Sequence, residues 1–360
     1  MMKRLTALLA GLALMFTLTA CGGSPASSGG SPASSGGNQG GTSQGTPTPT
    51  EKPIEIKLTT TDPSNAPTVT QLENCAKEIR EKTNGMIDIQ VYADGQMLVY
   101  AEGVEAMMSN ANLFLVATPS YLVDYMPVMS TLVSPYLFSS REVAAAFFES
   151  DYFKGIEAEC EAAGFHVICN DGLIGYRSVC ANAPVNSVAD VQKLALRISS
   201  GDVMVRLFTD LGCNYTVMSF SDVFNGLQTG AIDGLECVPL TITANSLYDA
   251  MSPMYYSRTS HILDCYGIYA GQEFWMSIPE EYRTIIQDVL GNWGKLATAD
   301  CVAQEETEIY PEYEAHNVTV VDLSDEAMQE FRTVGEVIIR DQVRGDEVLA
   351  AVAEVEAGLK

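Results

Sequence analysis

Residues 54–60 read Ile-Glu-Ile-Lys-Leu-Thr-Thr, and this stretch begins the pattern that decides the fold. Apolar and polar side chains alternate in it, as they do in a half-buried strand. Turn-forming residues follow at 62–65, and apolar residues then recur at helical spacing over 69–79 until Asn84-Gly85 ends the pattern. A second strand pattern follows at 86–92. Strand, helix and strand in this order form a β-α-β unit, which favours parallel pairing.

The alternation of strand and helix patterns continues along the chain. We expect a helix over 101–108 and short apolar strands over 113–117, 165–169, 194–198 and 262–268. From Pro279 to Tyr310 apolar residues recur at helical spacing without a strong break, which predicts a helix long enough to pack on two domains. The sequence therefore predicts an α/β fold with mainly parallel sheets, whose ligands bind beyond the carboxyl ends of strands.

The charge balance is strongly acidic, with 20 basic and 46 acidic side chains. Nucleic acids and anionic membrane surfaces are bound by clustered Lys and Arg, so the composition argues against both as partners. A small anionic ligand is not excluded, because it meets only the few charges that line its own pocket.

The N-terminal residues have the features of an export signal. Lys3 and Arg4 precede the apolar stretch 5–18, and Leu18-Thr19-Ala20-Cys21 resembles a bacterial lipobox. We expect residues 1–21 to form a lipoprotein signal with the lipid on Cys21; an ordinary signal peptide and a short anchor are the alternatives. Residues 22–51 consist mainly of Gly, Ser, Pro and Thr, which predicts a disordered linker that tethers a folded domain to the membrane.

Motifs for catalysis and for metal binding are missing from the sequence. The eight cysteines besides Cys21 stand singly in apolar stretches, without a CxxC pair and without a histidine at ligand spacing. We expect most of them to be small buried hydrophobic residues, His261 to be structural, and no metal or other cofactor to be bound. From residue 52 onward the sequence contains no GxSxG, P-loop, HExxH or dinucleotide-binding motif. The one GxSxG match, residues 41–45, lies in the Gly/Ser-rich stretch and lacks the strand and helix that would flank a catalytic serine. These observations favour a binding protein over an enzyme.

Two arginines lie inside apolar stretches, Arg177 within 174–179 and Arg197 within 194–198. Each alone is most simply explained by a salt bridge at a strand end. Two of them, 20 residues apart in a chain with few cations, favour an anion site. The planar guanidinium group donates two parallel hydrogen bonds to a carboxylate.

Three stretches match the motifs of one known family. The most specific is 218–234, Met-Ser-Phe-Ser-Asp-Val-Phe-Asn-Gly-Leu-Gln-Thr-Gly-Ala-Ile-Asp-Gly, which is similar to the signature S-F-S-E-V-Y-x-A-L-Q-T-G-x-V-D-G. Residues 196–198, Leu-Arg-Ile, resemble an L-R-V-P motif, and residues 274–280 resemble F-W-x-S-L-P-E. On these motifs the chain, from residue 54 to about 341, resembles the dicarboxylate-binding type of solute-binding protein that serves tripartite ATP-independent periplasmic (TRAP) transporters.

The resemblance implies a two-lobe periplasmic-binding-protein-like fold with crossing hinge strands and one long helix that spans both lobes. Lobe I would comprise 52–174 plus 265–302, lobe II would comprise 175–264 plus 303–345, and 346–360 would be a C-terminal tail. The resemblance also implies that Arg197 is the principal partner of the ligand carboxylate, that Arg177 supplies a second contact, and that Phe220 covers the ligand.

Two positions depart from the family pattern. Cys237 stands where the family has an asparagine that reaches the ligand, and Ser199 replaces the proline that follows the arginine. A thiol is a weak hydrogen-bond donor, so the ligand would have a less demanding polar body or would contact other groups. Thr61, Thr118 and Tyr121 follow predicted strands and are expected to face the ligand; the alternative is that they are turn residues without ligand contact.

The sequence thus predicts an extracytoplasmic, lipid-anchored solute-binding protein. It would capture a small carboxylate-bearing organic anion and deliver it to the membrane subunits of a TRAP transporter. A receptor for an ABC-type importer or for a membrane sensor is the first alternative. An extracellular enzyme on a similar fold is the second, and it would need an acid/base or nucleophile pair in the cleft.

Overall fold

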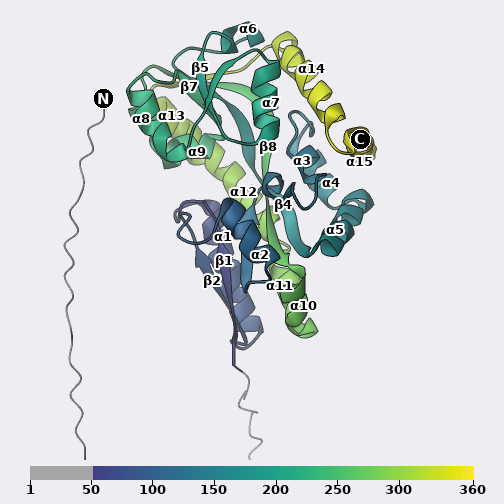
Figure 1. Ribbon diagram of the computed structural model, residues 1–360. Helices are drawn as coiled ribbons and strands as arrows, with labels where there is room; N and C mark the ends of the chain where they lie inside the picture. Colours follow the sequence, from purple (N-terminus) through teal and green to yellow (C-terminus); the bar gives the residue numbers. More distant parts are fainter. Residues whose placement is uncertain (1–51) are drawn as a thin grey trace, which may run out of the picture. The chain divides into compact units, whose positions relative to one another are not determined.

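The computed structural model describes residues 52–360. The predicted lipoprotein signal with Cys21 and the predicted linker 22–51 lie outside the described residues. The described part folds into two α/β lobes that share one continuous mixed sheet (Figure 1). No helix in residues 52–360 combines the length and the apolar character needed to cross a membrane.

Nine strands make up the sheet in the described part of the chain. They are β1 (Ile54–Thr59), β2 (Ile87–Tyr92), β3 (Leu113–Ala117), β4 (Phe165–Ala181), β5 (Ala195–Ile198), β6 (Asn214–Val217), β7 (Gly234–Cys237), β8 (Met254–Gly271) and β9 (Val318–Val321). Their order is β2-β1-β3-β8-β4-β7-β5-β6, with β9 beside β8. The outer groups, β2-β1-β3 and β7-β5-β6, are parallel, whereas β3-β8, β8-β4 and β4-β7 are antiparallel.

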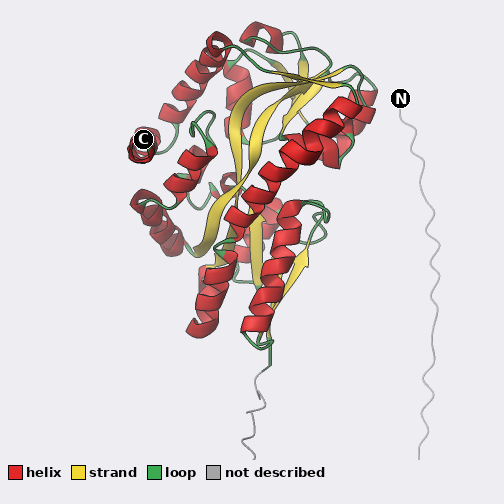
Figure 2. Ribbon diagram, turned by 180° about the vertical axis from the view of Figure 1, so that it is seen from behind, coloured by secondary structure: helices red, strands yellow, loops and turns green. Residues whose placement is uncertain are grey.

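Helices cover both lobes (Figures 1 and 2). The α-helices are α1 (Pro67–Lys82), α2 (Tyr100–Met108), α3 (Met129–Leu132), α4 (Arg141–Phe148), α5 (Asp151–Ala163), α6 (Val188–Val191), α7 (Asp202–Asp210), α8 (Val223–Gln228), α9 (Pro239–Ala244), α10 (Gln272–Ser277), α11 (Glu280–Leu290), α12 (Trp293–Gln304), α13 (Tyr310–Ala315), α14 (Asp325–Asp341) and α15 (Gly345–Leu359). Short 3-10 turns are η1 (Pro119–Leu122), η2 (Phe220–Asp222) and η3 (Leu247–Asp249), and η4 (Glu305–Ile309) is a π-helical turn.

The strands β4 and β8 pair along most of their length and run through both lobes (Figure 1). The expected strands 165–169 and 262–268 are therefore parts of much longer strands. The β4-β8 register shifts four times, between Val167 and Val179, and such bulges bend and twist a strand pair. Because of these bulges, β4 and β8 can bend and pair in both lobes. They are the crossing strands that the sequence predicted.

The long helix expected from Pro279 to Tyr310 is interrupted. Helix α11 ends at Leu290, and Gly291 and Asn292 separate it from α12. Glycine and asparagine are both poor residues for a helix interior, and the Asn292 amide donates to the Asp288 carbonyl. From Trp293 the chain then continues through α12, η4 and α13 to Ala315 and crosses from one lobe to the other (Figure 2). The π-helical turn η4 ends at Ile309, two residues before Pro311. Proline has no N–H to donate, and its ring clashes with the carbonyl group four residues earlier in an α-helix, so a wider turn fits at this place.

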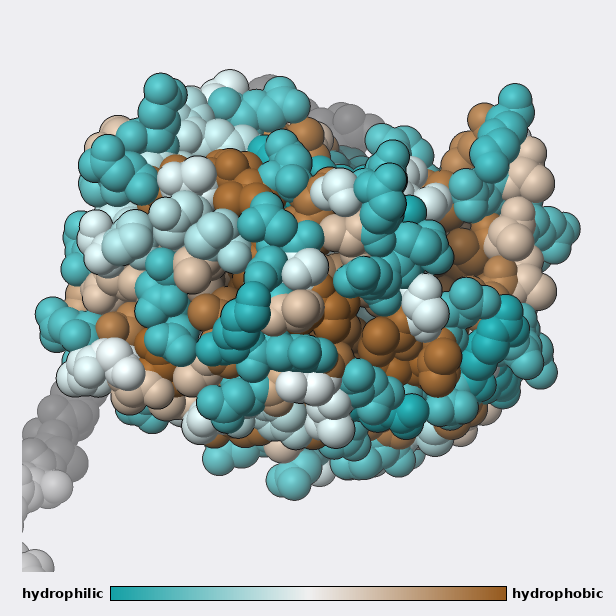
Figure 3. Space-filling model, turned by 90° about the horizontal axis from the view of Figure 1, so that it is seen from above, coloured by the Kyte–Doolittle hydropathy of each residue, from teal (hydrophilic) through white to brown (hydrophobic). Residues whose placement is uncertain are grey.

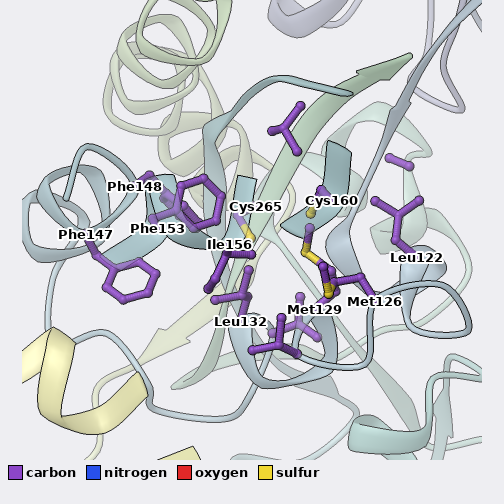
Figure 4. Close-up of a cluster of buried hydrophobic side chains, with 14 of the residues drawn as sticks. Leu122, Met126, Met129, Leu132, Phe147, Phe148, Phe153, Ile156, Cys160 and Cys265 are labelled. Atoms are coloured by element: carbon purple, nitrogen blue, oxygen red, sulfur yellow. The ribbon is translucent and has the colours of Figure 1, made fainter. Parts of the chain in front are cut away.

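Separate hydrophobic cores lie in the two lobes. One core packs α1, α11 and α12 on β1–β3, and another packs the helices α3–α5 on the first part of β4 (Figure 4). The second of these includes an aromatic group of Phe138, Phe147, Phe148 and Phe153. Two further cores lie around β5 and β7. The C-terminal residues 345–359 form a helix whose Val348 and Val352 are buried in the core with α4.

The surface is rich in polar side chains, with smaller apolar groups between them on the face in Figure 3. Within residues 52–360 the eight cysteines are free thiols, and seven of them are buried. This agrees with the prediction that they act mainly as small hydrophobic residues.

Candidate functional site

Arg197 lies on β5, next to the edge strand of the sheet and between β6 and β7. Its side chain is 6% exposed, and its Nε donates to the Met218 carbonyl at 2.9 Å. The guanidinium carbon lies 5.7 Å from the centre of the Phe220 ring, within the range of a cation–π contact. The carbonyl and the ring therefore fix the position of the guanidinium from two sides.

The terminal nitrogens of Arg197 donate no hydrogen bond within the described residues, and its guanidinium forms no ion pair there. Burial lowers the pKa of Arg197, an effect that the Glu236 charge partly offsets. Arginine nevertheless stays charged in proteins, so a nearly buried cation here has four of its five N–H donors free. A carboxylate that accepts two parallel hydrogen bonds fits this geometry.

Arg177 on β4 has a different environment. Its Nε and one terminal nitrogen donate to the two carboxylate oxygens of Glu236 at 2.6 and 2.9 Å, and the other terminal nitrogen donates to Asp264 at 2.9 Å. A further bond reaches the Glu236 carbonyl at 3.3 Å. Four of its five N–H groups are therefore used, and one remains for a ligand.

The acidic partners of Arg177 come from the neighbouring strands β7 and β8. Burial acts to raise the pKa of Glu236, but the charge and hydrogen bonds of Arg177, together with the nearby His261, outweigh it and lower the pKa to about 2. For Asp264, burial outweighs the same guanidinium and raises the pKa. Glu236 is thus a fixed anion, and Arg177 is held by a structural ion pair.

His261 belongs to this buried network. Its Nδ1 lies 2.9 Å from the Thr259 hydroxyl, and its Nε2 lies 3.6 Å from a Glu236 oxygen. Burial lowers the pKa of His261 despite the nearby carboxylate, which favours the neutral ring. The structure therefore places His261 inside the protein, as the sequence predicted.

Aromatic residues approach the arginines from the lobe that contains β1–β3. Tyr121 lies in η1 directly after β3, and its ring centre is 5.2 Å from that of Tyr100. Burial raises the pKa of Tyr121 to about 12, and the charges of Tyr100 and Asp264 add to the increase, whereas Arg177 and Arg197 oppose it. Tyr121 is therefore within electrostatic range of both arginines, and its role as a ligand contact stays a prediction.

The other predicted residues are placed as follows. Thr118 directly follows β3, and Thr61 lies two residues after the end of β1. The two strands are paired in parallel, so both residues lie at the same edge of the sheet, and both are partly exposed. The Thr118 hydroxyl is hydrogen-bonded to Ser120. Cys237 ends β7 and is only 2% exposed, and burial raises the pKa of its thiol to about 12.

Three acidic residues were missed by the sequence analysis. Glu236 lies in the short apolar strand β7, and Asp264 lies in the apolar part of β8. A charge inside an apolar stretch is the same signal that singled out the two arginines, so it was available for these acids too. Asp62 follows β1 like Thr61, and its Oδ2 accepts a hydrogen bond from Thr68 at 2.5 Å. Burial and the nearby Asp264 charge raise the pKa of Asp62 to about 6.

The family model for bacterial extracellular solute-binding proteins, family 7 (DctP), matches residues 58–346. The chain belongs to this family. The C4-dicarboxylate-binding periplasmic protein DctP of Rhodobacter capsulatus is 28% identical over 241 residues, which cover 64% of this chain and 69% of that protein. The sialic acid-binding periplasmic protein SiaP of Vibrio cholerae is 28% identical over 208 residues, 57% of this chain and 64% of that protein.

Solved structures support the same fold. A TRAP periplasmic solute-binding protein of Fusobacterium nucleatum with bound sn-glycerol 3-phosphate has a TM-score of 0.77 at 24% identity and covers 85% of this chain and 99% of its own. One from Actinobacillus succinogenes with bound L-galactonate has a TM-score of 0.74 at 23% identity, covering 83% and 99%.

These matches confirm the predicted two-lobe α/β fold. The family match also confirms that the chain is a solute-binding protein rather than an enzyme. The dicarboxylate-binding type stays a prediction, because the named relatives bind dicarboxylates and sialic acid. The alternative of an ABC-type receptor is not favoured.

Proposed function

We propose that the protein captures a small carboxylate-bearing organic anion outside the cytoplasmic membrane and delivers it to the membrane subunits of a TRAP transporter. The named relatives that bind dicarboxylates and sialic acid support the ligand class. The TRAP proteins with a similar fold support the transport partner.

The observation that carries the proposal is the contrast between the two arginines. Arg177 forms ion pairs with Glu236 and Asp264, whereas Arg197 is nearly buried and lacks an anionic partner among residues 52–360. A buried cation without a partner is costly, and a ligand carboxylate would remove that cost. Arg197 is therefore the principal anchor, and Arg177 contributes one remaining N–H.

The ligand is held between residues of both lobes. Arg177, Arg197, Phe220 and Cys237 belong to the proposed lobe II (175–264 plus 303–345), and Thr61, Thr118 and Tyr121 to the proposed lobe I (52–174 plus 265–302). A ligand that contacts both groups stabilises a closed arrangement, with the crossing strands β4 and β8 as the hinge.

The protein is held at the outer surface of the membrane by a lipid on Cys21, with 22–51 as the tether. This part of the proposal rests on the lipobox-like sequence alone. Replacing Cys21 by Ala should release the protein from washed membranes, and retention of the variant would contradict the lipid anchor.

Native mass spectrometry of the gently purified protein tests the proposed function. We expect a bound organic acid that is recovered chemically unchanged after long incubation. The Arg197→Ala variant should carry none, whereas Arg206→Ala should carry as much as the wild type, because Arg206 is an exposed residue of α7 paired with Asp210. A ligand without an acidic group, or turnover of the ligand, would contradict the proposal.

A further inference from the structure

Carboxyl groups outnumber guanidinium groups in the region of Arg197. Two guanidinium groups, Arg177 and Arg197, face three carboxyl groups, those of Glu236, Asp264 and Asp62. Glu236 and Asp264 share the single charge of Arg177. Acidic groups are therefore in excess before any ligand binds, and only Arg197 remains to neutralise an incoming anion.

Asp62 is the acid without a cationic partner. It forms no ion pair within residues 52–360, and the groups that shift its pKa are Thr68, Asp264 and Tyr266. Strand β1 is parallel to β3, and the end of β3 pairs with Gly267 of β8, three residues from Asp264, which accepts from Arg177 at 2.9 Å. The loop after β1 that carries Asp62 therefore lies at the same edge of the sheet, and the mutual pKa effects of Asp62, Asp264 and Tyr266 agree with this placement. Asp62 comes from the β1 side of this edge, and Arg197 comes from β5.

The Asp62 carboxyl group is held in place but is not saturated. Its backbone N–H donates to the Thr60 hydroxyl at 3.1 Å, and its Oδ2 accepts from Thr68, the second residue of α1. The neighbouring loop is fixed as well, since the Gly95 N–H donates to the Thr60 carbonyl at 3.1 Å. Among the described residues only Thr68 donates to the carboxyl group with ordinary hydrogen-bond geometry, although the nearby Tyr266 hydroxyl also lowers its pKa, and Asp62 is partly exposed to solvent. A carboxylate oxygen in this position accepts hydrogen bonds and cannot donate them.

We propose that Asp62 is a specificity-determining residue that accepts a hydrogen bond from a hydroxyl or ammonium group of the ligand. This inference rests on the proposed function, with Arg197 as the carboxylate anchor. The ligand is then a monocarboxylate that carries a hydrogen-bond donor away from its carboxylate, such as a hydroxy acid or an amino acid. A second carboxylate in that place would meet Asp62 and Asp264 with no free cation to neutralise it, and such like-charge contacts disfavour binding.

A matched series of four-carbon acids tests the inference. Succinate, γ-hydroxybutyrate, γ-aminobutyrate and butyrate differ only in the group at the far end, which is a carboxylate, a hydroxyl, an ammonium and a methyl group. Galactonate serves as a larger polyhydroxy probe. Binding of each is measured by titration calorimetry to the wild type, Asp62→Asn, and the control Glu73→Gln on the exposed face of α1. Asparagine has the shape of aspartate and can still accept from Thr68, so the fold should be kept, which circular dichroism checks.

We expect a donor-bearing monocarboxylate to bind the wild type more tightly than succinate and butyrate do. Asp62→Asn should weaken that binding about tenfold or more, because a hydrogen bond to a charged acceptor is lost, and should strengthen succinate binding. Glu73→Gln should change neither. The hydroxyl and ammonium probes then distinguish a hydroxy acid from an amino acid as the natural ligand class.

Three results would overturn the inference. They are tightest binding of succinate to the wild type, unchanged binding of the donor-bearing acids to Asp62→Asn, and no binding of any donor-bearing monocarboxylate at millimolar concentration. In the first two cases the proposed function stands if Arg197→Gln abolishes binding of the acids. Failure of every acid to bind the wild type would overturn the proposed function as well.

Discussion

Arg177 and Glu236 form a bidentate ion pair between the neighbouring strands β4 and β7, with N–O distances of 2.6 and 2.9 Å. Glu236 is fully buried, and the side chain of Arg177 is 18% exposed. The pair keeps Arg177 in position and makes Arg197, two strands away in the sheet order, the cation with free donors.

Breaking this pair should strongly destabilise the fold. Glu236→Gln leaves the Arg177 charge nearly buried with only Asp264 opposite it, and removing one partner of a buried ion pair typically costs about 3–5 kcal/mol. Urea denaturation measures the loss. Asp322→Asn removes the partner of Arg258 in an exposed pair and should cost at most about 1 kcal/mol. Equal effects of the two variants would show that the Arg177–Glu236 pair does not support the fold.

Two glycines provide a matched test of the packing of the long helix. A Cβ on Gly294 in α12 would lie 2.0 Å from Asp171 Oδ1 and 2.7 Å from the Gly172 backbone nitrogen on β4. Gly294→Ala should therefore destabilise the protein by about 1–3 kcal/mol, the usual cost of overpacking. Gly155 in α5 has no atom within 4 Å of its added Cβ, and Gly155→Ala should stabilise by up to about 1 kcal/mol. Thermal denaturation of both variants checks the opposite signs.

The raised pKa of Asp62 predicts a specific pH dependence. Its pKa is about 6 in the folded protein against 3.8 for the free group, so the folded state binds the proton more tightly. The stabilisation from this proton is complete below about pH 4 and is lost as the pH rises through about 6. Relative to Asp62→Asn, the wild type should lose about 1 kcal/mol between these values, allowing for the solvent that reaches the half-buried carboxyl group. The melting temperatures of the wild type and Asp62→Asn are compared between pH 4 and pH 7. A difference between them that stays constant, or that moves in favour of the wild type as the pH rises, would contradict the raised pKa of Asp62.

Ligand binding should close the two lobes. The residues proposed to contact the ligand come from both sides of the crossing strands, so the closed arrangement gains contacts that the open one lacks. Small-angle scattering should show a smaller radius of gyration with ligand, and the melting temperature should rise. A rise in melting temperature without compaction would support ligand binding but contradict the closure of the two lobes.

The sequence predicted individual elements well where a local pattern decides them. The expected strand 113–117 coincides with β3, and the expected strands at 54–60 and 86–92 differ from β1 and β2 by one residue. The full lengths of β4 and β8 were missed, because bulges break the two-residue period and both faces are buried for much of their course. The break at Gly291 was missed because the apolar spacing continues across it.

The site was predicted in part. The charge of Arg177 acts on the pKa of Arg197, so the two arginines are within electrostatic range, and the expected anion site at them stays a prediction. Sequence alone does not tell which arginine is already paired. That distinction depends on Glu236 and Asp264, which reach Arg177 from residues 59 and 87 positions away. The acid at position 62 was missed because a turn residue after a strand has no pattern that separates a ligand contact from a surface position.

The most direct test of the central claim is the affinity of Arg197→Ala for the acid recovered from the purified protein, measured by titration calorimetry. Loss of a charge-assisted pair shielded from water should weaken binding by about 30-fold to several thousand-fold, with the melting temperature of the ligand-free protein preserved. The exposed-arginine control Arg206→Ala should bind like the wild type. A change of less than about threefold for Arg197→Ala would contradict the account, because Arg197 would then not be the anchor of the ligand.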